Sequence, residues 1–147
     1  MLSIIDEITH RKSVKSLTGF EFNWEIKGSY DALLLGAFVN QQIVGLAEFD
    51  RQPRELYNYM HLIEVHPDFR GSSVAGELLA WIGLDAFNHG FDGFVVFEAK
   101  SANYGMYIKK YGAKPLRDRR LHFDTEATRQ LIKTYIEPFV TGGETND

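Results

Sequence analysis

The sequence predicts a mixed α/β domain built on one central sheet. The length of 147 residues suits one domain, and an apolar fraction of 44% is typical of a globular core. A series of apolar segments of strand length in the first half favours an antiparallel sheet. A strand–helix–strand unit across residues 56–97 adds a right-handed parallel crossover, so the sheet is mixed. We expect a single domain over residues 1–140 and a frayed tail at 141–147.

The N-terminal half is predicted to hold one helix and four strands. Residues 2–16 place three isoleucines on one helical face, and residues 20–26 alternate apolar and polar residues as a strand does. A hairpin is expected where two apolar runs flank the polar pair Asn40-Gln41. The strands expected in this half cover residues 20–26, 31–39, 42–49 and 56–65, and a polar loop is expected at 50–55.

The C-terminal half is predicted to alternate helices with strands. A helix over residues 74–88 carries its apolar residues on one face, and Ser73 is its expected N-cap. The last helix is expected to be capped by Asp124 or Thr125. The elements expected after the first of these helices are a strand at 93–97, a helix at 103–111, a strand at 121–123 and a helix at 126–136.

The composition excludes several classes of function. The chain has no cysteine, which excludes a disulfide scaffold, a thiolate metal site and a cysteine nucleophile. A net charge of -4 argues against nucleic acid as the main partner, because phosphate binding needs a basic surface. The apolar stretches are far shorter than the ~20 residues that span a bilayer, and charges interrupt the N-terminal segment, unlike a secretory signal. The histidines show no metal-ligand spacing. We therefore expect a cytoplasmic protein with no metal, membrane or nucleic-acid partner.

Residues 62–79 carry the most informative signal for function. A strand runs into a loop of small residues, and the loop opens a helix. Small residues let backbone N–H groups converge, the helix N-terminus adds partial positive charge, and Arg70 adds a full one. Together these features suit a pyrophosphate. The alternative is that the small residues serve turn geometry alone.

The same loop resembles motif A of the GCN5-related N-acetyltransferase (GNAT) family, whose signature is Arg or Gln, two residues, Gly, one residue, then Gly or Ala. The sequence reads Arg70-Gly71-Ser72-Ser73-Val74-Ala75, with Ser73 where the family usually has glycine. Downstream, Glu98-Ala99-Lys100-Ser101 followed by Tyr107 and Gly112-Ala113 resembles the family's motif B, with Ser101 in place of the usual asparagine. The resemblance covers about residues 31–116.

The resemblance implies the GNAT acyl-CoA N-acyltransferase fold, a twisted mixed sheet with two splayed parallel strands and flanking helices. It implies that acetyl-CoA binds between the strands at 56–65 and 93–97 as a co-substrate, without a metal. A primary amine would attack the thioester directly, with no acyl-enzyme. The backbone of Ile63 and Val65 would hold the pantetheine arm. The other residues implied in cofactor binding are Arg70, Gly71, Ser72, Ser73, Val74, Ala75 and Ser101.

Direct transfer needs a base, because an ammonium has no lone pair, and the family usually carries that base on the strand before motif A. The candidates there are Tyr57, Tyr59, His61 and Glu64. Strand parity puts the first three on one face and Glu64 on the other, unless a bulge intervenes. We expect His61 to be the base, since histidine titrates near neutral pH, and Glu64 is the second choice. The alternative is that His61 only packs or hydrogen-bonds within the sheet.

The acid for the departing thiolate is expected to be Tyr107. The family's tyrosine position falls on Ile108, so a helix irregularity would be needed to bring Tyr107 into place. The alternative is protonation by solvent.

The acceptor region departs from the family layout. About nineteen residues precede the first confident strand, where the family normally has a strand and two helices that shape the acceptor pocket. We therefore expect a pocket that is open, or completed by a second chain in a homodimer, and an acceptor that is a small-molecule or protein amine. The alternative is a non-catalytic GNAT-fold protein that binds coenzyme A or a protein partner as a regulatory module. The basic run Arg117–Arg120 is expected to be a solvated turn, or else to contact a coenzyme A phosphate or an acidic substrate.

Overall fold

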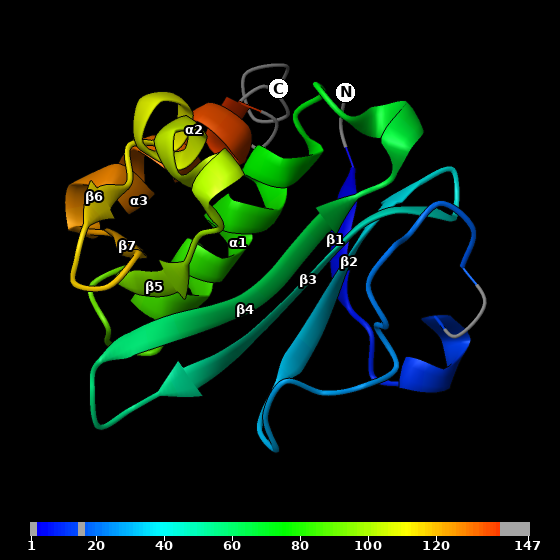
Figure 1. Cartoon of the computed structure of the whole chain (residues 1–147), viewed down its shortest axis with the longest axis horizontal. Helices are drawn as coiled ribbons and strands as arrows, with labels where there is room; N and C mark the ends of the chain where they lie inside the picture. The colour runs from blue at the N-terminus through cyan, green and yellow to red at the C-terminus, as the bar shows by residue number, and fades with distance from the viewer. Residues whose placement is uncertain (1–2, 15–16, 139–147) are drawn as a thin grey trace, which may run out of the picture.

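A seven-stranded sheet forms the centre of the molecule, in the order β1-β2-β3-β4-β5-β7-β6 (Figure 1). The computed structural model describes residues 3–14 and 17–138, so the tail expected at 141–147 lies outside the described residues. Every neighbouring pair of strands is antiparallel except β4 and β5, which run parallel, and the predicted mixed sheet is therefore confirmed. The strands are β1 Ile4–Glu7, β2 Leu33–Val39, β3 Gln42–Gln52, β4 Tyr57–Val65, β5 Val95–Glu98, β6 Lys114–Pro115 and β7 Arg120–Phe123.

Three α-helices follow the strand-rich half: α1 Val74–Asn88, α2 Ser101–Tyr111 and α3 Thr125–Tyr135. Short 3-10 turns stand at Arg11–Val14 and Pro67–Phe69. Figure 1 shows all three helices gathered over the part of the sheet that carries β4 to β7. Within the described ranges, none of these helices has the length and apolar character needed to cross a bilayer.

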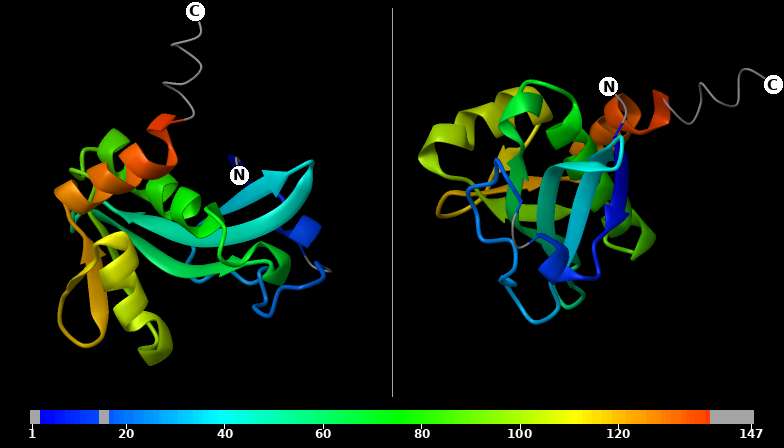
Figure 2. Two further views of the ribbon diagram at one scale, coloured as in Figure 1. Left: turned by 90° about the horizontal axis from the view of Figure 1, so that it is seen from above. Right: turned by 90° about the vertical axis from the view of Figure 1, so that its right-hand side faces the viewer.

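Helix α3 packs closely on α1 because α1 has two glycines on one face, seven residues apart (Figure 2). A Cβ added at Gly76 would lie 2.3 Å from the ring of Tyr135, and one at Gly83 would lie 2.3 Å from Cγ2 of Thr128. The order of these contacts makes the two helices antiparallel. Asp124 caps α3 by accepting a 2.9 Å hydrogen bond from the amide of Ala127, as predicted.

The predicted helix over residues 2–16 is wrong. Its isoleucines belong instead to strand β1, which pairs antiparallel with β2 from Ile4 opposite Phe38 to Glu7 opposite Leu35. Pairing with a distant strand outweighed the helical spacing, and β-branched side chains favour that outcome.

The predicted strand over residues 20–26 is also wrong, since this segment is irregular. Its alternation has another cause: Phe20, Phe22 and Trp24 turn inward onto a cluster that includes Leu34 and Leu46 of the sheet. Residues 8–14 and 17–32 thus cover one face of β2 to β4, while α1 packs on the other face.

Strand β4 contains a bulge at His61. Leu62 pairs with Glu48 of β3 and Met60 pairs with the next residue, Phe49, so His61 is the extra residue of the ladder. The bulge reverses the parity of β4. As a result Glu64 faces the same side of the sheet as Tyr59, contrary to simple alternation.

Candidate active site

The two parallel strands separate beyond a short paired section. β4 and β5 pair only from Asn58 opposite Val95 to Met60 opposite Phe97, and residues 61–65 of β4 have no parallel strand beside them in the described part of the chain. A first cleft of about 90 Å³ opens in this gap. It is lined by Phe22, Met60, His61, Leu62, Ile63, Phe97, Glu98, Ala99, Lys100, Asn103 and Tyr107.

A second cleft, of about 270 Å³, adjoins the first. It is lined by Tyr59, His61, Glu98, Ala99, Lys100 and Arg119. The two clefts share His61 and residues 98–100, so they meet at the bulge of β4. A group held in one cleft can therefore reach a group held in the other beside the imidazole of His61.

The imidazole of His61 is held by a buried carboxylate. Nε2 of His61 lies 2.6 Å from Oδ2 of Asp50, which is 2% exposed. Asp50 also accepts hydrogen bonds from Ser29 and Gln52. Burial alone would raise the pKa of Asp50, but the hydrogen bonds from Ser29, His61 and Gln52 together bring it below its ordinary value. Because a carboxylate only accepts, Nε2 carries the hydrogen, and Nδ1 is the nitrogen left to take a proton.

The backbone of Gly28 lies directly against this pair. A Cβ at Gly28 would stand 3.1 Å from Cγ of His61 and 2.4 Å from Oε1 of Glu48. The amide of Gly28 donates a 2.8 Å hydrogen bond to the same Glu48 oxygen, and Arg11 forms an ion pair with the other at 2.7 Å. The backbone can come this close to His61 and Glu48 only because residue 28 is a glycine and has no Cβ.

Glu64 anchors the N-terminal segment and lines neither of the two clefts. Its carboxylate accepts hydrogen bonds from the amides of Glu21 (2.6 Å) and Phe22 (3.2 Å) and from Nε1 of Trp24 (2.8 Å). Together with Glu48 and Asp50 it forms a row of three buried carboxylates, which hold Arg11 and residues 21–29 on this face. Sequence analysis missed Glu48 and Asp50, although acidic residues at alternate positions at the end of an apolar strand were a usable signal.

Tyr107 lines the first cleft without any irregularity in α2. Its ring packs edge-on against Phe97, with 4.8 Å between centroids, and is 9% exposed. Burial, with a smaller contribution from Tyr111, raises the pKa of Tyr107 to about 12, so the hydroxyl stays protonated at neutral pH. Ile108, at the family position, packs against the core instead.

The loop before α1 forms a tight turn. Gly71 has a φ of +80°, which explains the glycine, and a Cβ there would meet no atom within 4 Å. Ser73 occupies the N-cap position as predicted, but its hydroxyl donates to Glu77 at 2.6 Å instead of capping an amide. Ser72 supplies the local contact, accepting a 3.3 Å hydrogen bond from the amide of Val74.

This loop fits a bound pyrophosphate. The amide of Val74 donates to Ser72, but those of Ala75 and Gly76 have no acceptor within the helix, the space beside Gly71 is open, and the guanidinium of Arg70 is exposed. Ala75 continues the first turn of α1. Of the remaining predicted cofactor residues, Ile63 lines the first cleft, and Val65 lies two residues after Ile63 at the end of β4. Ser101 is the exposed first residue of α2.

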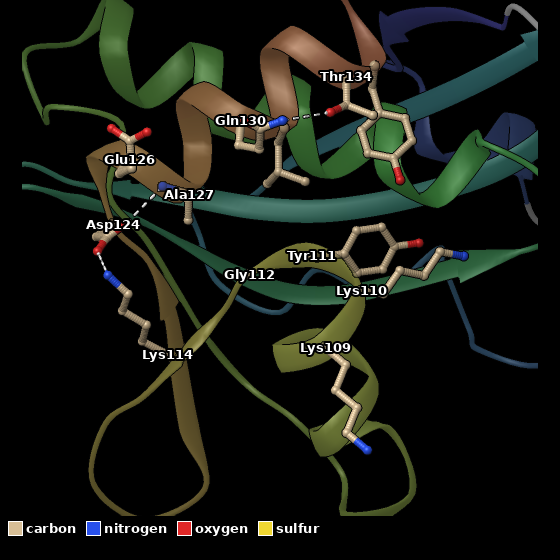
Figure 3. Close-up of a pocket in the computed structure, with 12 residues that line it drawn as sticks. Lys109, Lys110, Tyr111, Gly112, Lys114, Asp124, Glu126, Ala127, Gln130 and Thr134 are labelled. Atoms are coloured by element: carbon tan, nitrogen blue, oxygen red, sulfur yellow. Dashed lines mark hydrogen bonds and ion pairs between the residues drawn. The ribbon is translucent and has the colours of Figure 1, made fainter.

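A wider pocket of about 430 Å³ lies between α2 and α3 (Figure 3). Tyr111 and Gly112 contribute to it from one side and Ala127 and Gln130 from the other. It contains none of the predicted site residues. The clefts at His61, although smaller, are lined by three of those residues: His61, Ile63 and Tyr107.

The sequence and the structure were compared with those of known proteins. No curated protein matches the sequence significantly. Among solved structures, the KacTA–DNA complex contains a chain with a TM-score of 0.63 and 12% identity, covering 90% of this chain and 99% of that one. The E. coli protein YhhK, solved bound to coenzyme A, has a TM-score of 0.61 and 12% identity, covering 82% and 98%. The CoA-dependent acyl-homoserine lactone synthase BjaI, solved with SAM and isopentyl-CoA, has a TM-score of 0.57 and 12% identity, covering 76% and 68%.

At these identities the solved structures establish the fold alone. The family model for acetyltransferases of the GNAT family matches residues 3–113, which include β1 to β5, the loop before α1 and all of α2. This chain therefore belongs to the acetyltransferase (GNAT) family.

Proposed function

We propose that this protein transfers an acetyl group from acetyl-CoA to a primary amine. The observation that carries the proposal is the position of His61, held by Asp50 at the point where the two clefts meet. Membership of the GNAT family supports acyl transfer, and the coenzyme A bound to YhhK supports the choice of co-substrate.

The first cleft and the loop before α1 would hold the co-substrate. The backbone of Ile63 and Val65, on the open edge of β4, would bind the pantetheine arm, and residues 70–75 the pyrophosphate, with Ser101 nearby at the start of α2. Acetyl-CoA supplies the thioester. The side chains of Met60, Phe97 and Tyr107 wall a small cleft, which favours a short acyl group over the longer one bound by BjaI.

The amine would enter through the second cleft. His61 takes one proton from the ammonium at Nδ1, directly or through a water, while Asp50 holds Nε2–H. The amine nitrogen then forms a bond to the thioester carbonyl carbon. The carbon–sulfur bond breaks, its electron pair leaves on sulfur, and the hydroxyl of Tyr107 protonates the thiolate. The new amide nitrogen releases its second proton, which returns through solvent to Tyr107, and His61 gives the first proton to solvent. The hydrogen bonds that Glu64 already accepts favour an anchoring role for it over that of a base.

The N-terminal segment contributes to both the first cleft and the support of His61. Phe22 lines the first cleft, and Ser29 fixes Asp50 behind His61. The absence of a nucleic-acid partner, expected from net charge, is not part of the proposal, because the similar fold in the KacTA complex occurs together with DNA.

The test combines binding with turnover. Acetyl-CoA is titrated into the protein by calorimetry, and thiol release is measured with a panel of primary amines. We expect binding in the micromolar range, and His61→Ala should lower kcat at least about 100-fold with little change in that affinity. His122→Ala is the matched control, since His122 lines neither cleft. No thiol release with any amine despite binding would support the regulatory alternative, and no binding would reject both.

A further inference from the structure

Three cations surround the second cleft. Lys100 and Arg119 line it, and Arg120 stands beside it with its guanidinium carbon 5.7 Å from the ring centroid of Tyr59. On the opposite side, Nζ of Lys100 lies 5.3 Å from the ring centroid of Phe22. Aromatic rings therefore fix two of the three cations at the rim.

No carboxylate pairs with these cations. Among residues 3–14 and 17–138, neither Lys100, Arg119 nor Arg120 takes part in an ion pair. Glu98 lines the same cleft, and it is the cross-strand neighbour of Arg120. The lining of the cleft thus combines one carboxylate, that of Glu98, with the two cations of Lys100 and Arg119.

The turn that carries Arg119 is held against the residue that follows β5. Asp118 has a φ of +54° and Arg119 a φ of +65°, in the left-handed region that non-glycine residues rarely adopt. The carbonyl of Arg119 accepts a 3.3 Å hydrogen bond from the amide of Ala99, which follows β5. The two positive φ values are those of a two-residue hairpin turn, closed by a 3.0 Å hydrogen bond from the amide of Arg120 to the carbonyl of Arg117, and this turn keeps Arg119 at the edge of the second cleft.

We infer that the acceptor is a small amine that also carries an anionic group, a carboxylate or a phosphate. Its ammonium would lie beside Glu98 and His61 before losing a proton, and its anionic group would contact Arg119 and Lys100. This inference rests on the proposed function, because it names the substrate class of the same site.

The test uses matched pairs of acceptors and a matched pair of variants. γ-Aminobutyrate is compared with its amide, and phosphoethanolamine with ethanolamine, in thiol-release assays of the full chain. We expect kcat/KM to be about tenfold higher or more for the anionic member of at least one pair, as one charge-assisted hydrogen bond would give. The two pairs distinguish a carboxylate from a phosphate.

Arg119→Gln should lower the ratio of kcat/KM between anionic and neutral members about tenfold. Arg117→Gln removes the same charge from the same connection without touching the cleft, so it should preserve the ratio. Lys100→Gln provides a second variant outside that turn and should also lower the ratio.

Equal use of both members of each pair would overturn the inference and leave the proposed function intact. Equal effects of Arg117→Gln and Arg119→Gln would also overturn it, because they would indicate long-range attraction instead of contact. If acetyl-CoA binds but none of the amines is acetylated, the proposed function fails and the inference fails with it.

Discussion

Nε2 of His61 and Oδ2 of Asp50 are 2.6 Å apart. The two residues lie on the neighbouring strands β4 and β3, whose pairing register shifts by one residue at His61. The bulge turns the imidazole toward the end of β3, where Asp50 also accepts hydrogen bonds from Ser29 and Gln52. A carboxylate in this position fixes the tautomer and the orientation of a histidine.

Replacing Asp50 with asparagine should therefore weaken catalysis without weakening co-substrate binding. Asp50→Asn offers its amide to the ring and removes the charge, so we expect kcat to fall about 10- to 100-fold. Steady-state kinetics and calorimetry with acetyl-CoA measure the two effects. Gln52→Ala, which removes only one donor to Asp50, is the control and should change kcat much less. An unchanged kcat in Asp50→Asn would remove Asp50 from the mechanism.

Tyr107→Phe should lower kcat about tenfold or more, because general acids contribute at least that much and the ring itself is retained. The pKa of about 12 also predicts that the wild-type rate will not fall on the alkaline side until well above neutral pH. Rate profiles across pH test both statements. Tyr111→Phe removes the hydroxyl of another buried tyrosine, outside the first cleft, and serves as the control. Equal losses in the two variants would contradict the role of Tyr107.

Glu64→Gln should reduce stability and spare chemistry. The amide group cannot accept from all three buried donors, so we expect the free energy of unfolding to fall by about 1–3 kcal/mol. Denaturant unfolding measures that loss of stability, and kcat at saturating substrates shows whether catalysis is unchanged. A kcat that falls as far as in His61→Ala, with little loss of stability, would restore Glu64 as the base.

Gly83→Ala should destabilise the contact between α1 and α3 by about 1–3 kcal/mol, because the new methyl would meet Cγ2 of Thr128. Thr128→Ser removes that methyl while its hydroxyl can still donate to the carbonyl of Gly93. The double variant should therefore recover much of the loss. Thermal or denaturant unfolding of the two single variants and the double variant provides the measurement, and simple additivity would contradict this packing.

Asp124 should make stability depend on pH at the acidic end. Hydrogen bonds from Lys114 and from the amide of Ala127 lower the pKa of Asp124 in the folded protein below 3.8. A lowered folded pKa stabilises the protein above the unfolded pKa, and this contribution disappears as the pH falls through the folded value. Asp124→Asn keeps a capping acceptor but cannot titrate. The stability advantage of the wild type over this variant should therefore shrink from pH 6 to pH 3, and a constant difference would contradict it.

The elements that the sequence predicts well are those decided by nearby residues. The helix over residues 74–88 is present with those bounds. The hairpin turns at Asn40-Gln41, which have φ values of +49° and +68° as a two-residue turn requires. Both sets of signals lie within a few residues of the element.

The elements that it predicts poorly depend on distant partners. Residues 4–7 form a strand because they pair with β2. Phe22 and Trp24 are held by hydrogen bonds to Glu64, which is about forty residues away in the sequence. Asp50 was missed for a related reason, since it was assigned to a polar loop that is in fact the end of β3. Its partner His61 was recognised only as a single residue, because the bulge that joins them cannot be read from either strand alone.

The unpaired status of His61 in the ladder has a consequence for how easily this protein could lose its chemistry. Deleting that one residue would bring Met60 and Leu62 together opposite Phe49 and Glu48, and β4 would become a regular strand in the register it already has on both sides. The pairing of β3 with β4 would be kept on both sides, and Asp50 would keep Ser29 and Gln52 as donors while losing His61. An inert descendant with an intact fold therefore lies a single codon deletion away, whereas the loss of most other residues of β4 would displace half of the strand.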